Sequence, residues 1–249
     1  MKAIAFHVEK GGVGKTTMVG NVGFQLAGRV KTLMVDADPQ GNLTGWYVAE
    51  GIGADLADVL QGKATLEEAI LPVRKNLSLL PTVAIDGELK TWSETQLPSK
   101  PFAFADVREK IDALGFEVAL FDLGPGISIL EKSILAAMDE VVGVAAAEAF
   151  SVDGLEIFEH ELAKLRTDRR ADFSVNKLII NRVNHAYSLH SAYLEQFKSL
   201  PYRIYQIGQS TGISDCVPAH QSVFEFDPRN RNAKEFERIA KELLKDGSP

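Results

Sequence analysis

The chain has 249 residues, of which 45% are hydrophobic and 24% are charged, and its formal net charge is −7. These values are typical of an ordinary globular protein, and they exclude intrinsic disorder and a fibrous architecture. A surface that is negative overall also excludes general attraction to nucleic acid or anionic lipid, so any such binding requires a local basic patch.

Short apolar segments rich in β-branched residues alternate with segments of helical periodicity along the chain. This alternation predicts an α/β fold with one doubly wound, mostly parallel sheet and helices on both faces, forming a single domain over residues 1–249. Several of the strand segments are apolar throughout, as strands covered on both faces are. Seven strands are predicted, beginning at Ala3, Thr32, Leu77, Glu117, Glu140, Lys177 and Arg203.

Two apolar stripes at helical spacing predict helices that pack on this sheet. The second of these helices is expected to begin with a capping box made by Asn232 and Glu235. Residues 81–101 show no clear period and are expected to form an irregular surface excursion. The stripes are Leu155, Phe158, Leu162 and Leu165 in one helix, and Phe236, Ile239, Ala240, Leu243 and Leu244 in the other.

The chain contains one cysteine, Cys216, and no apolar run that reaches the length of a membrane span. A single cysteine cannot form an internal disulfide, so we expect a buried thiol in a reducing compartment. The N-terminal apolar stretch runs directly into a glycine loop and is interpreted as a strand, not a signal peptide. These features predict a protein of the bacterial or archaeal cytoplasm that does not contact the membrane.

The stretch Glu9–Thr17 reads EKGGVGKTT, with a strand before it and a helix from about Thr16, which predicts a phosphate-binding loop. Its glycines let the backbone bend tightly and bring N–H groups against phosphate oxygens, where a Cβ would collide. Lys15 is placed to reach the β- and γ-phosphates, and the Thr16 hydroxyl to ligate Mg²⁺. The candidate nucleotide-binding residues are Gly11, Gly12, Val13, Gly14, Lys15, Thr16 and Thr17.

A second lysine, Lys10, stands where this loop needs none, in the form KGGVGKTT. This form resembles the signature of the ParA/MinD family of deviant Walker A ATPases. The resemblance implies that Lys10 crosses the interface of an ATP-bound homodimer and contacts the phosphates of the partner's ATP. A cation in that place stabilises charge that develops during phosphoryl transfer, as arginine fingers do. Lys10 and Lys15 are therefore both predicted to be catalytic.

Three aspartates follow strands that lead toward the same region. Asp36 and Asp38 alternate along a strand end in VDADPQGNLT and so point to the same side. Asp122 ends the apolar strand ALFDLGPG, the position from which a Walker B aspartate holds a Mg²⁺-bound water. The family resemblance implies that Asp36 lies near the Mg²⁺ shell and that Asp38 orients the hydrolytic water. The segment departs from the family in having Gly124 in place of a proline.

Two further segments resemble the family's strands. The segment VVGVAAAEAFSVDG implies a place for Glu148 near the dimer face, and IINRV implies that the amide of Asn181 reads the adenine edge. A turn role for Asn181 remains the alternative.

The resemblance implies a Mg²⁺-dependent ATPase that binds ATP and ADP and whose hydrolysis a ParB-like or other partner protein stimulates. Partition members of the family bind DNA nonspecifically as ATP dimers and would associate with the nucleoid. Such binding needs basic side chains, yet no lysine or arginine occurs from Gln206 to Asp227. A basic cluster exists at residues 164–170, where it equally suits a solvated helix end. Only DGSP follows the last predicted helix, in place of a MinD-type amphipathic anchor.

Three functional hypotheses follow. The first is a switch that segregates or positions DNA, in plasmid or chromosome partition, with a variant that positions a protein cargo without DNA. The second is a metabolic ATP-dependent synthetase on the same fold, such as a dethiobiotin-synthetase-like enzyme, against which the DPQGN motif argues. The third is a reductase component like nitrogenase iron protein, which a single cysteine per chain makes implausible.

Overall fold

The computed structural model describes residues 1–8, 10–84, 87–146, 152–169, 171–198 and 200–245, and within these residues eight strands form one sheet. The strands are β1 (Lys2–His7), β2 (Thr32–Ala37), β3 (Leu71–Arg74), β4 (Leu77–Leu80), β5 (Val118–Leu123), β6 (Glu140–Ala146), β7 (Ser174–Val183) and β8 (Arg203–Gly208). Their order is β3-β4-β2-β5-β1-β6-β7-β8, and every neighbouring pair is parallel except β3 and β4. The predicted α/β fold with a mostly parallel sheet is confirmed.

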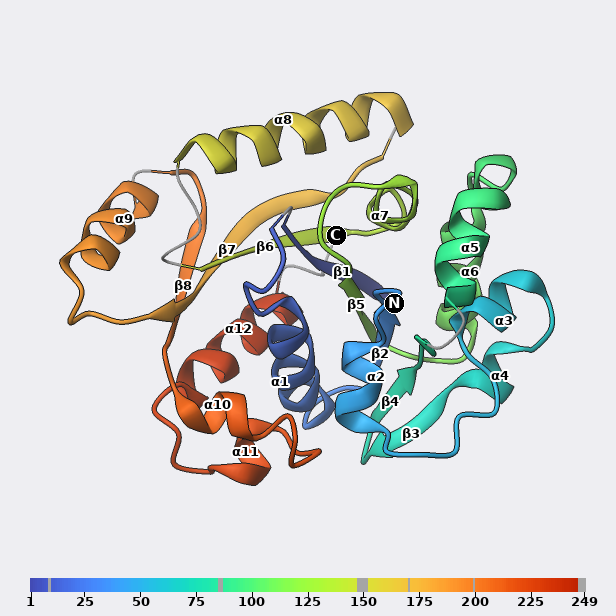
Figure 1. Ribbon diagram of the computed structural model, residues 1–249, viewed down its shortest axis with the longest axis horizontal. Helices are drawn as coiled ribbons and strands as arrows, with labels where there is room; N and C mark the ends of the chain where they lie inside the picture. The colour runs from blue at the N-terminus through green and yellow to red at the C-terminus, as the bar shows by residue number, and fades with distance from the viewer. Residues whose placement is uncertain (9, 85–86, 147–151, 170, 199, 246–249) are drawn as a thin grey trace.

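Helices cover both faces of the sheet, as Figure 1 shows, with α7 and α8 on one side and α1 and α12 on the other. The longer helices are α1 (Lys15–Ala27), α5 (Glu88–Thr95), α6 (Ala103–Ala113), α7 (Ile129–Leu135), α8 (Val152–Arg169), α9 (Ser188–Lys198) and α12 (Ala233–Lys245). The shorter ones are α2 (Asn42–Tyr47), α3 (Leu56–Gln61), α4 (Leu66–Ala69), the 3-10 helix η2 (Leu97–Ser99), α10 (Thr211–Asp215) and α11 (Val223–Phe226).

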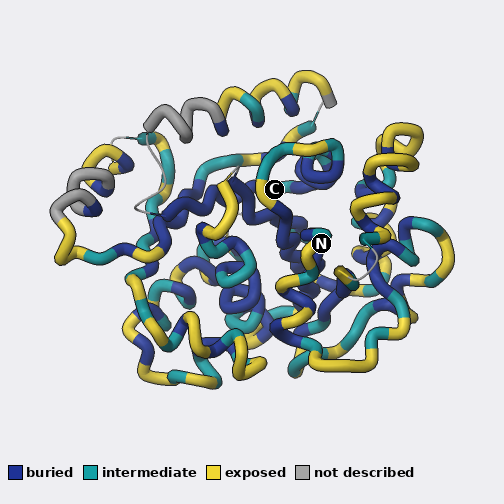
Figure 2. The backbone as a smooth tube through the Cα atoms, viewed as in Figure 1, coloured by how far each residue is buried: buried dark blue, intermediate teal, exposed yellow. Residues whose placement is uncertain are grey.

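The hydrophobic core lies between the sheet and these two helical layers, and the central strands are largely buried (Figure 2). Strands β2, β5 and β6 are buried along their whole length, and β1 is buried from Ala3 onward. Both predicted apolar stripes face this core. Phe158, Leu162 and Leu165 are buried on α8, whereas the side chain of Leu155 lies outside the described residues. On α12, Leu244 is partly buried, and the buried members of the stripe are Phe236, Ile239, Ala240 and Leu243. Cys216 is a buried free thiol, as expected. No helix among the described residues has both the length and the apolar character needed to cross a bilayer.

Two parts of the chain differ from the sequence-based prediction. Residues 81–101 were expected to be irregular, but they contain α5 and η2, and Leu89 and Trp92 of α5 are buried. The prediction was wrong because only these two apolar side chains, three residues apart, mark the buried face of α5. The short edge strand β3 was also not predicted, since three of its four residues are only partly buried and the fourth, Pro72, is exposed.

The predicted capping box at the start of α12 does not form, because its two side chains hydrogen-bond to the edge strand β8. Asn232 Oδ1 accepts the Gly208 N–H at 2.7 Å, and Asn232 Nδ2 donates to the Gly208 carbonyl at 3.0 Å. Glu235 Oε1 accepts the Gln206 N–H at 3.2 Å. The unpaired backbone groups along the outer edge of β8 are thus satisfied by the first turn of α12, which protects this edge from pairing with another chain.

Candidate functional site

The glycine loop joins the end of β1 to the start of α1 and is held in place by β7. Gly12 and Gly14 have left-handed backbone, with φ of 74° and 98°. Nδ2 of Asn181 donates to the carbonyl of Val13 at 2.8 Å, which ties the loop to the carboxyl end of β7. A Cβ added at Gly14 would lie 2.3 Å from that Nδ2 atom, so only glycine fits here.

Helix α1 begins at Lys15 without a side-chain cap. The first intrahelical bond runs from the Met18 N–H to the Gly14 carbonyl, at 3.0 Å. The N–H groups of the first turn have no intrahelical acceptor, and the helix dipole adds partial positive charge at this end. The half-buried Thr16 and Thr17 belong to this turn. The loop and the helix end together present N–H donors and partial positive charge of the kind that suits a phosphate group.

Two of the predicted aspartates face each other across adjacent strands. Asp36 on β2 is the register partner of Asp122 on β5, and both side chains are fully buried. Burial raises the pKa of Asp36 to about 7, against the lowering effect of hydrogen bonds from Thr44. Burial and the nearby Asp36 raise the pKa of Asp122 well above its usual value, and the nearby Thr16 hydroxyl partly opposes this rise. Neither side-chain oxygen of Asp122 has a hydrogen-bond partner of ordinary geometry among the described residues.

Asp36 is oriented by residues that sequence reasoning missed. The N–H and the hydroxyl of Thr44, on α2, both donate to Asp36 Oδ2 at 2.7 Å. The Thr82 hydroxyl donates to the Asp36 carbonyl, and the Thr82 N–H donates to Thr44 Oγ1 at 3.0 Å. Asp36 Oδ1 has no partner among the described residues. One oxygen of Asp36 is therefore fixed by α2, and the other is available to a ligand.

Lys15 is buried beside several carboxylates. Burial lowers the pKa of Lys15, and Asp122, Asp38 and Glu131 oppose this shift. Glu131 was not predicted as a site residue, although Ser128 and Glu131 show the spacing of a capping box, and the structure forms that box at the start of α7. A Cβ at Gly124 would lie 3.2 Å from Glu131 Oε1 and 3.5 Å from Asp38 Oδ1, so Gly124 leaves room for both carboxylates.

The remaining predicted residues do not all converge on this cluster. Lys10, Gly11 and Gly12 are exposed on the outer side of the loop, and Glu148 lies outside the described residues. Asn181 is buried, and both ends of its amide are engaged, since Oδ1 accepts the Arg182 N–H at 2.8 Å. Asn181 thus positions the glycine loop in this structure, and its contact with adenine stays a prediction.

A cavity of about 470 Å³ lies at the carboxyl ends of β7 and β8, beside the residues that follow Asn181 in the chain. Its lining residues are Val183, Asn184, His185, Ala186, Gln206, Gly208, Arg231 and Asn232.

The residues present suit a magnesium ion that is shared with a bound polyphosphate. Among the described residues, no group of three or more His, Cys, Asp or Glu side chains could hold a metal ion. Magnesium instead takes one or two carboxylates in such sites and completes its octahedral shell with water and phosphate oxygens. Three carboxylate oxygens are buried without a hydrogen-bond partner among the described residues, namely Asp36 Oδ1 and both side-chain oxygens of Asp122. Thr16 is adjacent to Asp122.

Comparison with known proteins gives consistent results. A family model described as an AAA domain (AAA_31) matches residues 1–175, which include the glycine loop and the three aspartates but not Asn181. The chain is 33% identical to the uncharacterized protein BBD21 of Borreliella burgdorferi, over 98% of this chain and 99% of that protein. It is 27% identical to the chromosome-partitioning ATPase Soj of Treponema pallidum, over 99% and 98% of the two chains. A Borrelia burgdorferi plasmid partition protein, BB_S35, solved with bound AMPPNP, has the same fold, with a TM-score of 0.83 and 23% identity over 98% of this chain and 99% of that one.

Proposed function

We propose that this chain, which belongs to the ParA/MinD family of deviant Walker A ATPases, is an ATP-dependent dimerising switch that segregates or positions DNA. The observation that carries the proposal is the burial of Lys15 beside Asp38 and Asp122, behind a glycine loop whose outer lysine, Lys10, is exposed. The partitioning role of the Treponema relative supports the part that concerns DNA. We take residues 1–249 as one ATPase domain that acts in the cytoplasm.

In the proposed reaction, the N–H groups from Gly11 to Thr17 bind the triphosphate of ATP, and Lys15 reaches its β- and γ-phosphates. Magnesium, held with Thr16, Asp36 and Asp122, would neutralise charge on the transferred phosphoryl group. Asp38 orients the attacking water, and its Oδ1 already accepts the Gln40 N–H at 2.9 Å, which fixes its rotamer.

Hydrolysis by the isolated protein is expected to be slow. The carboxylate of Glu131 is oriented by the start of α7, where its Oε2 accepts the Ser128 N–H at 2.9 Å. No glutamate directly follows Asp122 to act as a general base, and Asp38 is assigned to orienting the water. A second subunit that contributes Lys10, and a ParB-like or other partner protein that stimulates this arrangement, would raise the rate.

The acidic net charge of −7 and the lack of lysine and arginine from Gln206 to Asp227 favour a second candidate. In this variant the same switch positions a protein cargo and does not bind DNA. Both candidates share the nucleotide chemistry, so they differ only in what the ATP-bound dimer binds.

Two lysine variants test the nucleotide chemistry. Lys15→Ala is expected to lose ATP binding, because it removes the only cation within the loop's interior. Lys10→Ala is expected to bind nucleotide normally but to stay monomeric with Mg²⁺ and AMPPNP, as measured by sedimentation velocity. A Lys10→Ala protein that dimerises and turns over like the parent would contradict the assigned role of Lys10.

Co-sedimentation with DNA distinguishes the two cargo classes. The measurement compares ATP, ADP and no nucleotide at several salt concentrations. Binding that requires ATP and weakens as salt rises is expected for a partition ATPase, because released counterions supply nonspecific affinity. Absence of binding in all three states would favour the protein-positioning candidate.

A further inference from the structure

Helix α2 has only six residues, and it begins at a left-handed Gly41 without a side-chain cap. An isolated helix of this length has almost no stability, so its position depends on contacts with the rest of the chain. Those contacts matter for the nucleotide site, because Thr44 on α2 holds the Oδ2 atom of Asp36.

One set of contacts joins α2 to α1, the helix that follows the glycine loop. The Tyr47 hydroxyl donates to the Gly20 carbonyl at 2.9 Å and is buried. The Trp46 ring lies directly over Gly20, since a Cβ added at Gly20 would be 2.1 Å from Cζ3 of that ring. Helix α2 therefore packs against α1 at a point where only glycine leaves room for the Trp46 ring.

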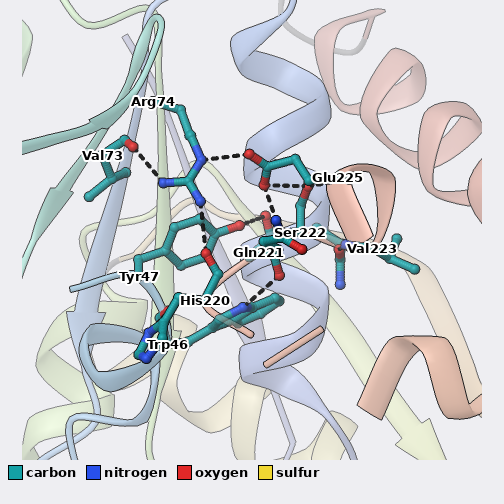
Figure 3. Close-up of polar contacts among 11 residues, drawn as sticks. Trp46, Tyr47, Val73, Arg74, His220, Gln221, Ser222, Val223 and Glu225 are labelled. Atoms are coloured by element: carbon teal, nitrogen blue, oxygen red, sulfur yellow. Dashed lines mark hydrogen bonds and ion pairs between the residues drawn. The ribbon is translucent and has the colours of Figure 1, made fainter. Parts of the chain in front are cut away.

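A second set joins α2 to residues 220–225, which lie just before and within α11 (Figure 3). Trp46 Nε1 donates to the Gln221 carbonyl at 2.8 Å. Nδ1 of His220 lies 2.9 Å from the Trp46 carbonyl and must carry the proton, because a carbonyl only accepts. Both the side chain and the backbone of Trp46 thus hold segment 220–225.

Arg74 at the end of β3 completes this attachment, as Figure 3 shows. Its Nη2 donates to the His220 carbonyl at 2.8 Å, and its Nε is 2.7 Å from Glu225 Oε1. The other Glu225 oxygen accepts the N–H and the hydroxyl of Ser222. The guanidinium also lies over the Tyr47 ring, 5.8 Å from its centroid. Arg74 therefore contacts both α2 and the segment that α2 holds.

Segment 220–225 is also tied to the phosphate-binding turn. Asn21 on α1 accepts the Val223 N–H at 2.8 Å, and its amide nitrogen donates to the Thr17 carbonyl at 3.0 Å. His220 has a φ of 53°, a left-handed backbone that costs a residue other than glycine energy and that its contacts must maintain. The segment is therefore held by both backbone and side-chain contacts, which maintain a left-handed backbone at His220.

We propose that Arg74, Trp46 and Tyr47 are positioning residues that link the seating of segment 220–225 to the placement of Asp36. In the seated state, in which segment 220–225 makes the contacts described above, these three residues fix α2, so that Thr44 orients Asp36 for magnesium. When the segment detaches, α2 and Asp36 lose this support. Linkage is reciprocal, so magnesium binding with nucleotide favours the seated state to the same degree. This proposal rests on the nucleotide site proposed above.

The test uses Trp46 as its own reporter. Trp92 is the only other tryptophan in the sequence, and its Nε1 has no partner among the described residues, so Trp92→Phe loses no hydrogen bond seen there. In this parent, Trp46 emission is recorded while Mg²⁺ is added at saturating AMPPNP, and AMPPNP affinity is measured separately in EDTA. Arg74→Gln is expected to raise the Mg²⁺ concentration at half-saturation by about five- to tenfold, with AMPPNP affinity in EDTA unchanged.

Three further variants make the result specific. Glu225→Gln removes the same ion pair from its other side and should give the same shift. Arg203→Gln removes an arginine–glutamate ion pair at the opposite edge of the sheet, where Arg203 Nη1 lies 3.1 Å from Glu242 Oε2. Its Mg²⁺ concentration at half-saturation should match that of the parent. Thr44→Val removes the hydroxyl bond from α2 to Asp36 and leaves only the bond from the Thr44 N–H, so Arg74→Gln should have a smaller additional effect on Mg²⁺ in that background.

The outcomes separate this inference from the proposed function. If the parent binds no AMPPNP, the proposed function and this inference both fail. If the parent binds AMPPNP but Arg74→Gln and Glu225→Gln leave the Mg²⁺ requirement unchanged, the inference alone is overturned. An equal loss of affinity with and without Mg²⁺, or a full Arg74→Gln effect in the Thr44→Val background, would also overturn it, because either result shows general loosening of the fold.

Discussion

Substitution of Gly14 by alanine tests how the glycine loop is held. The structure gives this position two separate constraints, a left-handed backbone with φ of 98° and the Nδ2 atom of Asn181 only 2.3 Å from an added Cβ. Gly12 provides a matched control, because it has a left-handed φ of 74° but no described atom within 4 Å of an added Cβ. Comparison of the two variants therefore separates backbone strain from the collision with Asn181.

The expected magnitudes follow from these two constraints. An L-residue in left-handed backbone costs about 1–2 kcal/mol, which is the whole expected effect of Gly12→Ala. Gly14→Ala carries that cost and also displaces the Asn181 amide from the Val13 carbonyl, which loses a buried hydrogen bond worth about 1 kcal/mol. We expect a total of about 2–3 kcal/mol, which lowers the melting temperature of a protein of this size by roughly 4–12 °C.

The assay is thermal and denaturant unfolding of the protein without nucleotide, so that contacts with a ligand do not contribute. Asn181→Ala removes the obstructing amide, and Gly14→Ala made in that background is expected to cost about 1–2 kcal/mol, as Gly12→Ala does. The reasoning is refuted if Gly14→Ala and Gly12→Ala destabilise equally, or if Asn181→Ala leaves the cost of Gly14→Ala unchanged.

Three other predictions concern pH and the edge of the sheet. Burial raises the pKa of Asp36 from 3.8 to about 7, so the parent loses stability as pH rises between these two values. Asp36→Asn should therefore gain stability relative to the parent from about pH 4 to pH 7, measured by unfolding without Mg²⁺. A stability difference that stays constant over this range would contradict the prediction. Burial lowers the pKa of His7 to about 3, and neither ring nitrogen has a hydrogen-bond partner among the described residues. His7→Leu should therefore stabilise the protein relative to the parent by an amount that grows as pH falls below 6.5. A stabilisation that shrinks on acidification would count against this prediction. Asn232→Ala should cost about 2 kcal/mol and speed hydrogen exchange of the Gly208 amide, whereas exchange at the same rate as in the parent would show that Asn232 does not protect the β8 edge.

The features of the site that sequence predicted are those encoded locally. The strand, the glycine loop and the helix from Lys15 are consecutive in the chain, and the left-handed residues of the loop are glycines. Asp36 and Asp122 could each be placed at a strand end from the apolar runs that precede them. Their direct opposition depends on the adjacency of β2 and β5, which is a property of the sheet order.

The features that sequence did not predict depend on contacts between distant segments. Asn181 meets Val13 across 168 positions of sequence, and no local pattern indicates that its amide supports the loop. Thr44 follows Asp36 by only eight residues, but its role requires the turn at Gly41 that brings α2 back over β2. The missed roles of Asn181 and Thr44 are therefore to support other residues of the site, and the sequence context of both residues resembles that of ordinary turn and helix residues.

One pattern with two outcomes shows why such support is hard to predict. Ser128 and Glu131 have the capping-box spacing and form the box, and Asn232 and Glu235 have the same spacing and do not. The difference lies in what is nearby, because the outer edge of β8 presents unpaired N–H groups to the first turn of α12. A buried edge without partners costs more than a helix end whose N–H groups remain accessible to water. Where a polar side chain has two acceptable partners, the tertiary environment selects between them, and sequence spacing alone does not.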